Sequence, residues 1–449
     1  MTSPRLAALA MLLVLAACAQ AIGPNAAARG VLPAQRALGS SKVDHVIIIV
    51  QENRSVDNLF NALPGAQTTQ YGLNSNGKRV RLQPISLTAP YDISHEHSAF
   101  QVEFNGGNLN GFNLVESHCQ RRENCPLKGQ RSYGYVPQSE VQPYYTMATQ
   151  YAFADHMFET NQGPSFPAHQ YLLSGTSTIK EGSSLRAAEN PLTPDDDFTG
   201  GCDSPRGSLV WLIDSSGNED REAYPCFDRP ALSDLLEAHS LSWRYYQERT
   251  GAGLWHGPDA IKHIWKSPDF KTNVVTPPSQ VLADISSGHL ATVAWVTPTA
   301  VSSDHAGTND GSGPSWVASV VNAVGKSSYW NDTVIFVVWD DWGGWYDHIV
   351  PPSLNAYELG FRVPLIAISP YAKRGYVSHK QHEFGSILKF VEEAFELGSL
   401  GTTDVRSDDL ADFFDFSQQP RRFKPIAARY PPAYFLRQRG GGPSPDDDY

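Results

Sequence analysis

Residues 43–57 read VDHVIIIVQENRSVD. The segment 46–50 within them is an unbroken run of β-branched residues, which is typical of a strand buried on both faces of a parallel sheet. Three further runs of this kind cover residues 291–296, 334–339 and 363–368. The sequence therefore predicts at least four buried strands.

Helical patterns separate these runs, at residues 231–239, 315–324 and 384–397. Strands that alternate with helices indicate an α/β fold with a mostly parallel central sheet flanked by helices. Stretches near 105–145 and 178–228 are rich in Gly, Asn and Asp, and we interpret them as cap or rim insertions. We expect one domain that carries two insertions.

The N-terminus looks like a bacterial export signal. Arg5 precedes an apolar run of twelve residues that is too short to anchor in a bilayer. The run ends in Leu-Ala-Ala-Cys at residues 15–18, which resembles a lipobox with Cys18 as the lipidated residue. Ordinary cleavage near Ala17 or Ala21 is the alternative. We expect an exported periplasmic or cell-surface lipoprotein with membrane contact through this anchor, or a secreted protein.

These patterns divide the chain into four predicted parts. They are a signal peptide with lipobox at 1–18, a flexible tether at 19–42, the main domain at 43–430 and a disordered tail at 431–449.

Four cysteines remain besides Cys18, a number that suits two disulfides in an exported protein. The local pairings are Cys119 with Cys125 and Cys202 with Cys226, but four cysteines allow three pairings and the sequence does not choose among them. A zinc site is the rival interpretation, and the absence of any C-x-x-C spacing disfavours it.

The overall charge restricts the partners. The chain has 35 Lys and Arg against 47 Asp and Glu, a formal charge of −12. That balance disfavours nucleic acid, which needs a basic surface. It is compatible with a small anionic substrate, because a bound cation reverses the local field.

Acidic residues follow two of the predicted strands. Glu52 and Asn53 come after the run 46–50, and Asp340 and Asp341 come after the run 334–339. Ligands gather at the carboxyl ends of strands in open α/β sheets. Carboxylates that converge there repel one another unless a cation lies between them, and oxygen ligands suit Mg²⁺, Mn²⁺ or Ca²⁺, with Zn²⁺ also possible. Each acid taken alone is more simply a helix cap.

A candidate nucleophile lies in residues 161–169, NQGPSFPAH. We expect Ser165 to be the N-cap of a helix over 166–174. The positive end of a helix and its free N–H groups favour an alkoxide and bind phosphate. A metal beside Ser165 would activate it further. Taken without its surroundings, this serine is only a cap.

Histidines supply candidates for charge stabilisation and for proton transfer to a leaving alcohol. His95 and His305 are the first choices, and His348 follows because it lies seven residues beyond Asp341. Asp304 precedes His305 and completes the set of candidate catalytic residues.

Residues 43–57 resemble the opening signature of the phosphoesterase family that contains bacterial phospholipases C and acid phosphatases. The segment 161–176 is similar to the nucleophile segment of that family, and later blocks also resemble it. The resemblance implies an alkaline-phosphatase-like α/β core and hydrolysis of phosphoric esters at one divalent metal. By residue match, the metal ligands would be Glu52, Asn53, Ser165, Asp340 and Asp341, and Ser165 would also be the nucleophile.

The substrate stays open between a phosphomonoester and a phospholipid. Aromatic residues such as Trp342, Trp345, Tyr346, Tyr133 and Tyr135 could bind a choline headgroup by cation–π contact, or they could be core. A sulfatase is less favoured, because His169 replaces the Arg of the sulfatase motif. The non-enzymatic alternative is an exported metal-containing lipoprotein that only binds a ligand.

Overall fold

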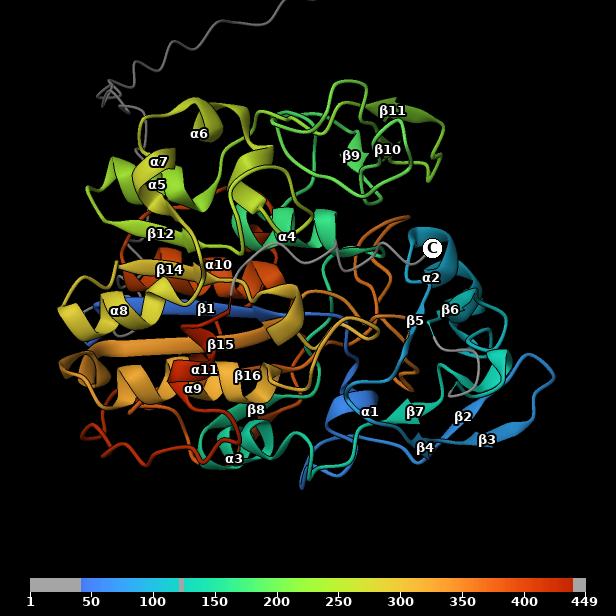
Figure 1. Ribbon diagram of the computed structural model, residues 1–449, viewed down its shortest axis with the longest axis horizontal. Coiled ribbons are helices and arrows are strands. Elements are labelled where there is room, and N and C mark those ends of the chain that lie inside the picture. Colours follow the sequence, from blue (N-terminus) through green and yellow to red (C-terminus); the bar gives the residue numbers. More distant parts are fainter. Residues whose placement is uncertain (1–41, 121–124, 439–449) are drawn as a thin grey trace, which may run out of the picture. The chain divides into compact units, whose positions relative to one another are not determined.

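The computed structural model describes residues 42–120 and 125–438 and contains a central sheet of eight strands (Figure 1). Their spatial order is β13-β12-β14-β1-β15-β16-β8-β17. The strand bounds are β1 His45–Gln51, β8 Ala152–Ala154, β12 Trp243–Tyr246, β13 Val274–Val275, β14 Val293–Val296, β15 Thr333–Trp339, β16 Leu365–Ile368 and β17 Tyr376–Ser378.

The centre of the sheet is β1, which pairs in parallel with both β14 and β15. Every residue from Val46 to Val50 has 0% of its surface exposed. The β-branched run is therefore buried on both faces, as predicted, and the α/β class with a large, mostly parallel sheet is confirmed.

The run 363–368 departs from the prediction in its direction. It forms β16, which is antiparallel to both neighbours, β15 and β8. The connection from β15 to β16 contains no helix that could return the chain to the opposite edge. Because the chain stays at the carboxyl end of β15, it enters β16 from that end.

Helices cover both faces of the sheet (Figure 1). On one face α3, α8 and α11 pack against α9, and on the other α4 packs against α10. The helix bounds are α1 Val56–Leu59, α2 His97–Phe104, α3 Gln142–Gln150, α4 Ser165–Ser174, α5 Leu232–Ala238, α6 Lys262–Lys266, α7 Phe270–Asn273, α8 Gln280–Ser287, α9 Gly313–Gly325, α10 Phe384–Ala394 and α11 Pro432–Phe435.

The predicted start of the disordered tail, residue 431, lies too early in the sequence. Residues 432–435 form α11, where Phe435 is 1% exposed and its ring centroid lies 5.3 Å from that of Trp316 on α9. Burial of this apolar side chain fixes the segment to the core. The predicted signal peptide, the tether up to residue 41 and the tail from 439 onwards lie outside the described residues.

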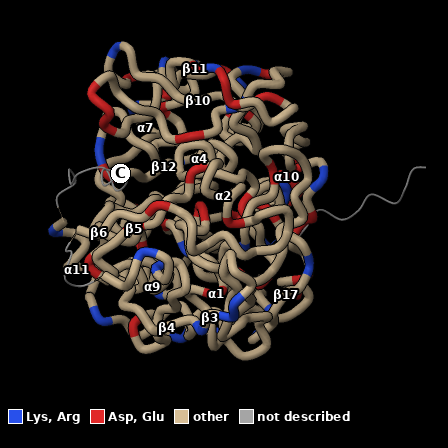
Figure 2. The backbone as a smooth tube through the Cα atoms, turned by 90° about the vertical axis from the view of Figure 1, so that its right-hand side faces the viewer, with Lys and Arg blue, Asp and Glu red and all other residues tan. Residues whose placement is uncertain are grey.

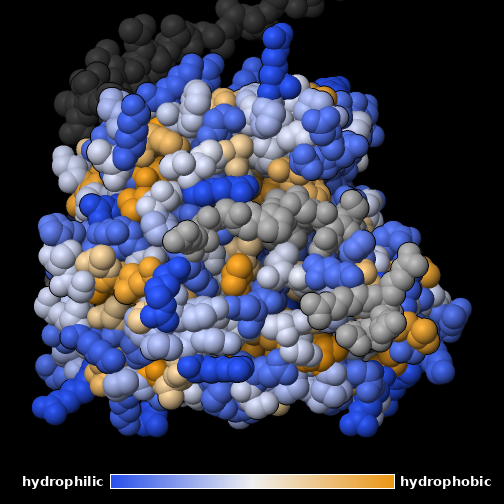
Figure 3. All heavy atoms as spheres, viewed as in Figure 1, coloured by the Kyte–Doolittle hydropathy of each residue, from blue (hydrophilic) through white to orange (hydrophobic). Residues whose placement is uncertain are grey.

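No helix within residues 42–120 and 125–438 is long and apolar enough to cross a membrane. On the face shown in Figure 3, hydrophobic residues form small groups between hydrophilic ones.

Two excursions leave the central sheet. The first, between β1 and β8, contains the short strands β2 (Tyr71–Leu73), β3 (Arg79–Arg81), β4 (Gln83–Pro84), β5 (Tyr91–Ile93), β6 (Ser117–Cys119) and β7 (Gly134–Tyr135), so it begins well before residue 105. The second carries a three-stranded sheet of β9 (Arg186–Ala187), β10 (Val210–Ile213) and β11 (Arg221–Ala223).

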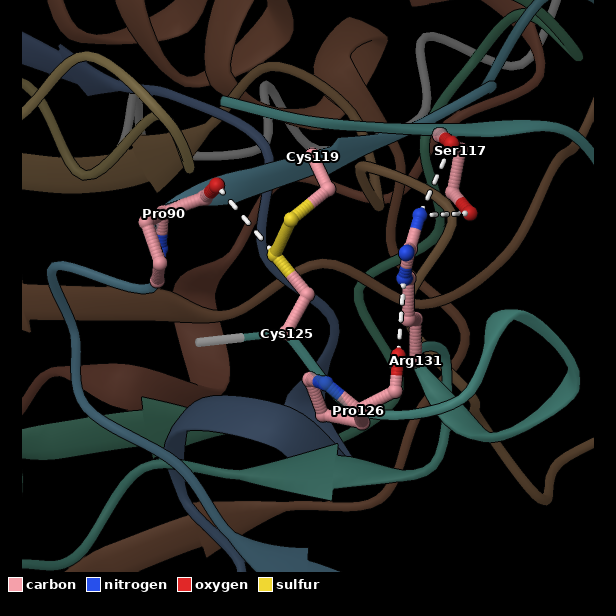
Figure 4. Close-up of a disulfide and its surroundings, with 6 residues drawn as sticks. All are labelled: Pro90, Ser117, Cys119, Cys125, Pro126 and Arg131. Atoms are coloured by element: carbon pink, nitrogen blue, oxygen red, sulfur yellow. Dashed lines mark hydrogen bonds between the residues drawn. A yellow bond between two sulfur atoms is a disulfide. The ribbon is translucent and has the colours of Figure 1, made fainter. Parts of the chain in front are cut away.

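Each excursion contains one disulfide, and both local cysteine pairings are present. Cys202 and Cys226 close the second excursion. Cys119 and Cys125 join within the first, beside Arg131, whose guanidinium donates to the carbonyl and the hydroxyl of Ser117 (Figure 4).

Candidate active site

The ends of β1 and β15 bring the predicted acids together. Gln51 is level with Trp339 in the parallel register, so the residues that follow each strand are neighbours. The backbone N–H of Asp340 donates to the carbonyl of Gln51 at 3.0 Å. The side chains of Glu52, Asn53, Asp340 and Asp341 all belong to residues that are 0% exposed.

Asn53 is held in an unusual backbone conformation. Its φ is 60°, and its backbone N–H donates to Asp340 Oδ1 at 3.0 Å. Gly343 follows the two aspartates with φ +61°, and a Cβ there would lie 2.4 Å from the carbonyl oxygen of Asn53. Only glycine permits this close approach of the two loops.

Ser165 is the first residue of α4, and Pro164, not Ser165, is the N-cap. Pro164 has no N–H and adopts an extended conformation, so the helix begins one residue earlier than predicted. The Ser165 hydroxyl donates to Asp341 Oδ2 at 3.2 Å. The serine still lies at the positive end of the helix and directly against the acids.

His169 joins the same group, and the sequence analysis missed it. Its Nε2 lies 3.3 Å from Glu52 Oε1 and 3.7 Å from Asp340 Oδ2. Burial lowers the pKa of His169 to about 4, although the charge of Asp340 opposes the shift. The ring is therefore neutral near pH 7 and offers a lone pair. Its spacing of four residues from Ser165 on a helix was the available signal.

These residues fit a divalent cation. Glu52, His169 and Asp340 place one ligand atom each within 4.8 Å of one another. Within the described chain, no donor reaches the buried Asn53 Oδ1 or Asp340 Oδ2. Buried oxygens without donors suit a cation, and the set of carboxylates, an amide oxygen and an imidazole is one that several divalent metals accept.

Two predicted histidines lie at this site. His95 Nε2 is 2.9 Å from Asn53 Nδ2 and 3.9 Å from Asp341 Oδ2, while its Nδ1 contacts the Ile93 carbonyl at 2.8 Å. The His305 ring centroid lies 6.1 Å from that of His95, and His305 is 0% exposed. The Nδ1 contact directs His95 Nε2 towards the acids.

Asp304 holds neighbouring elements of the site together through its hydrogen bonds. Its carboxylate accepts from the Tyr144 hydroxyl at 2.8 Å and from Trp339 Nε1 at 3.0 Å, and its carbonyl accepts from Arg54 Nε at 2.8 Å. Burial raises the pKa of Asp304 to about 6, against the opposing charge of Arg54. Asp304 thus ties the end of β15 to the loop that carries His305.

His348 belongs to a different cluster. Its Nδ1 lies 2.6 Å from Asp57 Oδ2, and Arg362 pairs with Asp347 at 2.7 Å beside it. Burial opposes protonation, but the hydrogen bond and charge of Asp57 raise the pKa of His348. The structure therefore groups His348 with Asp57 and Arg362, apart from Ser165.

A cavity of about 470 Å³ borders the site at His95 and Pro164. Its wall includes Trp211 and Phe198 from the second excursion. The aromatic residues considered for a choline headgroup are not among the residues that line this cavity. Trp342, Trp345, Tyr346 and Tyr133 are 0 to 4% exposed and belong to the core, and the partly buried Tyr135 packs against the cluster that contains Tyr133, Trp342 and Tyr346.

The chain is similar to known proteins along most of its length. The model of the phosphoesterase family matches residues 43–398. Non-hemolytic phospholipase C from Pseudomonas aeruginosa is 24% identical over 434 residues, which cover 81% of this chain and 56% of that protein. Phospholipase C A from Mycobacterium tuberculosis is 20% identical over 443 residues, 85% of this chain and 79% of that protein.

Among solved structures, a protein in the alkaline phosphatase superfamily from Vibrio parahaemolyticus matches with a TM-score of 0.36 and 11% identity over 82% of this chain and 70% of that one. The chain spans little more than half of the Pseudomonas relative. The family match nevertheless covers both strand ends, the start of α4 and both histidines of the site. The chain belongs to the phosphoesterase family.

Proposed function

We propose that this protein hydrolyses phosphoric esters, with Ser165 as the nucleophile and a divalent metal held by Glu52, Asn53, Asp340, Asp341 and Ser165. The observation that carries the proposal is the 3.2 Å contact of the Ser165 hydroxyl with Asp341, inside a buried group of acids. A serine at a helix start, opposite converging carboxylates, is expected for phosphoryl transfer, whereas a protein that only binds a ligand would not require it.

The residues of the chain have separate tasks in this reaction. Asp341 accepts the proton of the Ser165 hydroxyl, and the serine oxygen attacks phosphorus. The positive end of the α4 dipole attracts the phosphoryl oxygens. The bond from phosphorus to the leaving alcohol breaks, and His95 or His305 gives that alcohol a proton. Water then attacks the phosphoserine and gives a proton to the same histidine, the bond from phosphorus to the serine oxygen breaks to release the phosphate product, and Asp341 returns its proton to the serine oxygen.

A divalent metal held by these residues would supply Lewis-acid chemistry, lowering the pKa of the serine hydroxyl and offsetting negative charge on the phosphoryl oxygens. Its identity stays open among Ca²⁺, Mg²⁺, Mn²⁺ and Zn²⁺. His169 is a neighbour of the ligands and offers a neutral imidazole.

The substrate is of phospholipase C type or acid phosphatase type. Relatives named phospholipase C support the first. Export of the protein with a lipid at Cys18 would place it at a membrane surface, where such a substrate lies. Export also agrees with the two disulfides.

The test uses the chain without residues 1–22 and two substrates, p-nitrophenyl phosphate and p-nitrophenyl phosphorylcholine, with and without chelator. We expect Ser165→Ala to lose activity by at least about a thousandfold. Ser319→Ala, a buried serine on α9, is the matched control. Mass spectrometry of acid-quenched enzyme should find the phosphoryl group on the peptide that contains Ser165. Full turnover by Ser165→Ala with metal bound would refute the covalent mechanism.

A further inference from the structure

One face of the hairpin formed by β2 and β3 is exposed and combines basic with apolar side chains. Successive side chains of a strand point to opposite faces, and the antiparallel register places exposed residues opposite exposed residues. Four side chains therefore share the outer face, Tyr71 paired with Arg81 and Leu73 paired with Arg79. Lys78, which precedes β3, is exposed as well. We call these five residues the hairpin face.

The opposite face of the hairpin is packed against the core. A Cβ at Gly72 would lie 2.8 Å from the ring of Tyr133 and 2.9 Å from the ring of Tyr346, so the backbone of β2 lies directly on these aromatic side chains. The Tyr133 hydroxyl donates to the Leu73 carbonyl at 2.7 Å, and the half-buried Val80 packs against the same cluster. The hairpin face is therefore presented on a well-packed support.

The hairpin lies in a segment without acidic residues. Residues 58–91 contain Lys78, Arg79 and Arg81 but no Asp or Glu, in a chain that has 47 acidic residues. Figure 2 shows basic segments beside β3 and β4. The guanidinium carbon of Arg79 lies 3.7 Å from the centre of the Tyr71 ring, so the cationic and aromatic groups form one continuous surface.

We propose that the hairpin face docks on a membrane surface rich in anionic phospholipid headgroups. In this arrangement the three cations lie against lipid phosphates, and Tyr71 and Leu73 enter the interfacial layer. The inference concerns where the protein binds. It goes beyond the proposed function, because it does not depend on which bond the protein cleaves.

The composition of the face favours a bilayer over a soluble polyanion. Basic residues are attracted to anionic lipids, and Tyr is enriched at membrane–water interfaces. Tyr71 is 38% exposed and Leu73 is 43% exposed. A bilayer interface would bury these two side chains, whereas nucleic acid would leave the leucine in water.

The formal charge of −12 does not oppose docking of this one face. At physiological salt, exposed charges are screened beyond about 8 Å, so an anionic bilayer interacts mainly with the residues that touch it. A long polyanion that wrapped around the protein would instead meet the acidic surface.

Vesicle sedimentation tests the proposal. Protein that starts at residue 23 carries no lipid at Cys18, and the described fold begins only at residue 42. The Ser165→Ala background prevents the proposed cleavage of vesicle lipid. The vesicles contain phosphatidylcholine alone or an equal mixture with phosphatidylglycerol. We expect binding to the anionic vesicles to be stronger by at least about tenfold at low salt, and to weaken as salt rises.

Substitutions in the hairpin face separate its two components. Lys78→Gln/Arg79→Gln/Arg81→Gln should weaken binding to the anionic vesicles by about a hundredfold, since each cation near an anionic surface contributes about fivefold. Tyr71→Ser/Leu73→Ser keeps the charges and should weaken binding by about tenfold, because apolar side chains no longer enter the interface.

The matched control removes three exposed lysines from α6 and α7 and should bind as the unsubstituted protein does. It is Lys262→Gln/Lys266→Gln/Lys271→Gln. The melting temperature, and turnover of p-nitrophenyl phosphate with Ser165 restored, should be unchanged in all three variants.

Four outcomes would overturn the docking proposal. They are equal binding to neutral and anionic vesicles, binding that survives when the hairpin cations are removed, an equal loss in the control, and stronger binding to duplex DNA than to anionic vesicles at the same salt. Vesicle binding is measured without turnover, so its failure leaves the proposed hydrolysis intact. An inactive protein that binds anionic vesicles through the hairpin face would count against hydrolysis alone.

Discussion

The Ser165 hydroxyl and the Asp341 carboxylate are hydrogen-bonded at 3.2 Å although 176 residues separate them. The contact joins the start of α4, which follows β8, to the end of β15, and β16 lies between those two strands. Neither residue by itself supplies both a hydroxyl group and an acceptor for the proton of that hydroxyl. The proposed nucleophile and its proposed proton acceptor lie together only because the sheet brings two strand ends to the same edge.

Metal content should depend on Asp340. Asp340→Asn keeps the size of the side chain but removes a charge from the buried group, so we expect metal affinity to fall by about ten- to a hundredfold and turnover to be lost. Elemental mass spectrometry of the dialysed protein measures the number of metal ions per chain and checks this expectation. The comparison variant is Asp408→Asn, from the separate group formed by His382, Asp408 and Asp412. If Asp408→Asn lost the metal and Asp340→Asn kept it, the assignment would be wrong.

The two histidines His95 and His348 should differ in importance. His95 contacts Asn53 and faces Asp341, so His95→Asn should lower kcat by about a hundredfold. His348 pairs with Asp57, and His348→Asn should lower kcat by less than about tenfold. Saturation kinetics with p-nitrophenyl phosphate measures both. A larger loss for His348→Asn would place the proton donor in the other cluster.

Gly343 should tolerate no side chain. Gly343→Ala forces a Cβ to 2.4 Å from the Asn53 carbonyl, and we expect it to cost about 3 kcal/mol of unfolding free energy and to reduce turnover. Gly77 also has positive φ, but a Cβ there meets nothing within 4 Å. Gly77→Ala should therefore cost only about 1 kcal/mol. Urea denaturation compares the two, and equal costs would contradict the proposed close approach.

Stability should fall in mild acid because of His169. Its pKa is about 4 in the folded protein against the ordinary histidine value of 6.5, so the unfolded chain binds the proton more readily between these values. The contribution of neutral His169 to the free energy of unfolding is fully present above pH 6.5. It is lost as pH falls towards 4, by up to about 3 kcal/mol. Urea denaturation of metal-free protein at about pH 7 and about pH 4.5 measures the loss. His169→Gln should show a smaller loss, and an identical one would exclude this residue as its source.

The disulfide between Cys202 and Cys226 should stabilise the second excursion. The cysteines are 24 residues apart, so replacing both by Ser should cost about 3 kcal/mol. The pair Cys119 and Cys125 is 6 residues apart, and its removal should cost about 2 kcal/mol. Thermal unfolding of the two double variants checks the order. If removal of the Cys119–Cys125 disulfide, which closes the shorter loop, cost more stability, loop-closure entropy would not be the source of the stabilisation.

The strands and the acids were predictable for a local reason. The run 46–50 is β-branched and apolar, and such runs are stable only when both faces are buried. Glu52 and Asp340 follow directly after such runs, so their position at the carboxyl edge needed only the assumption of parallel strands. The short strands β8, β12, β13 and β17 were missed because two to four residues carry too little periodicity to identify a strand.

The sequence by itself determined which segments are buried, where Glu52, Asn53, Asp340 and Asp341 fall relative to strand ends, and that Ser165 opens a helix. These are local properties, set by side-chain shape and by the residues next along the chain. Only the tertiary structure decided that β16 runs antiparallel, and that His169 joins the acids while His348 pairs with Asp57. Those relations depend on strand order and on the paths of long connections, and neighbouring residues do not encode them.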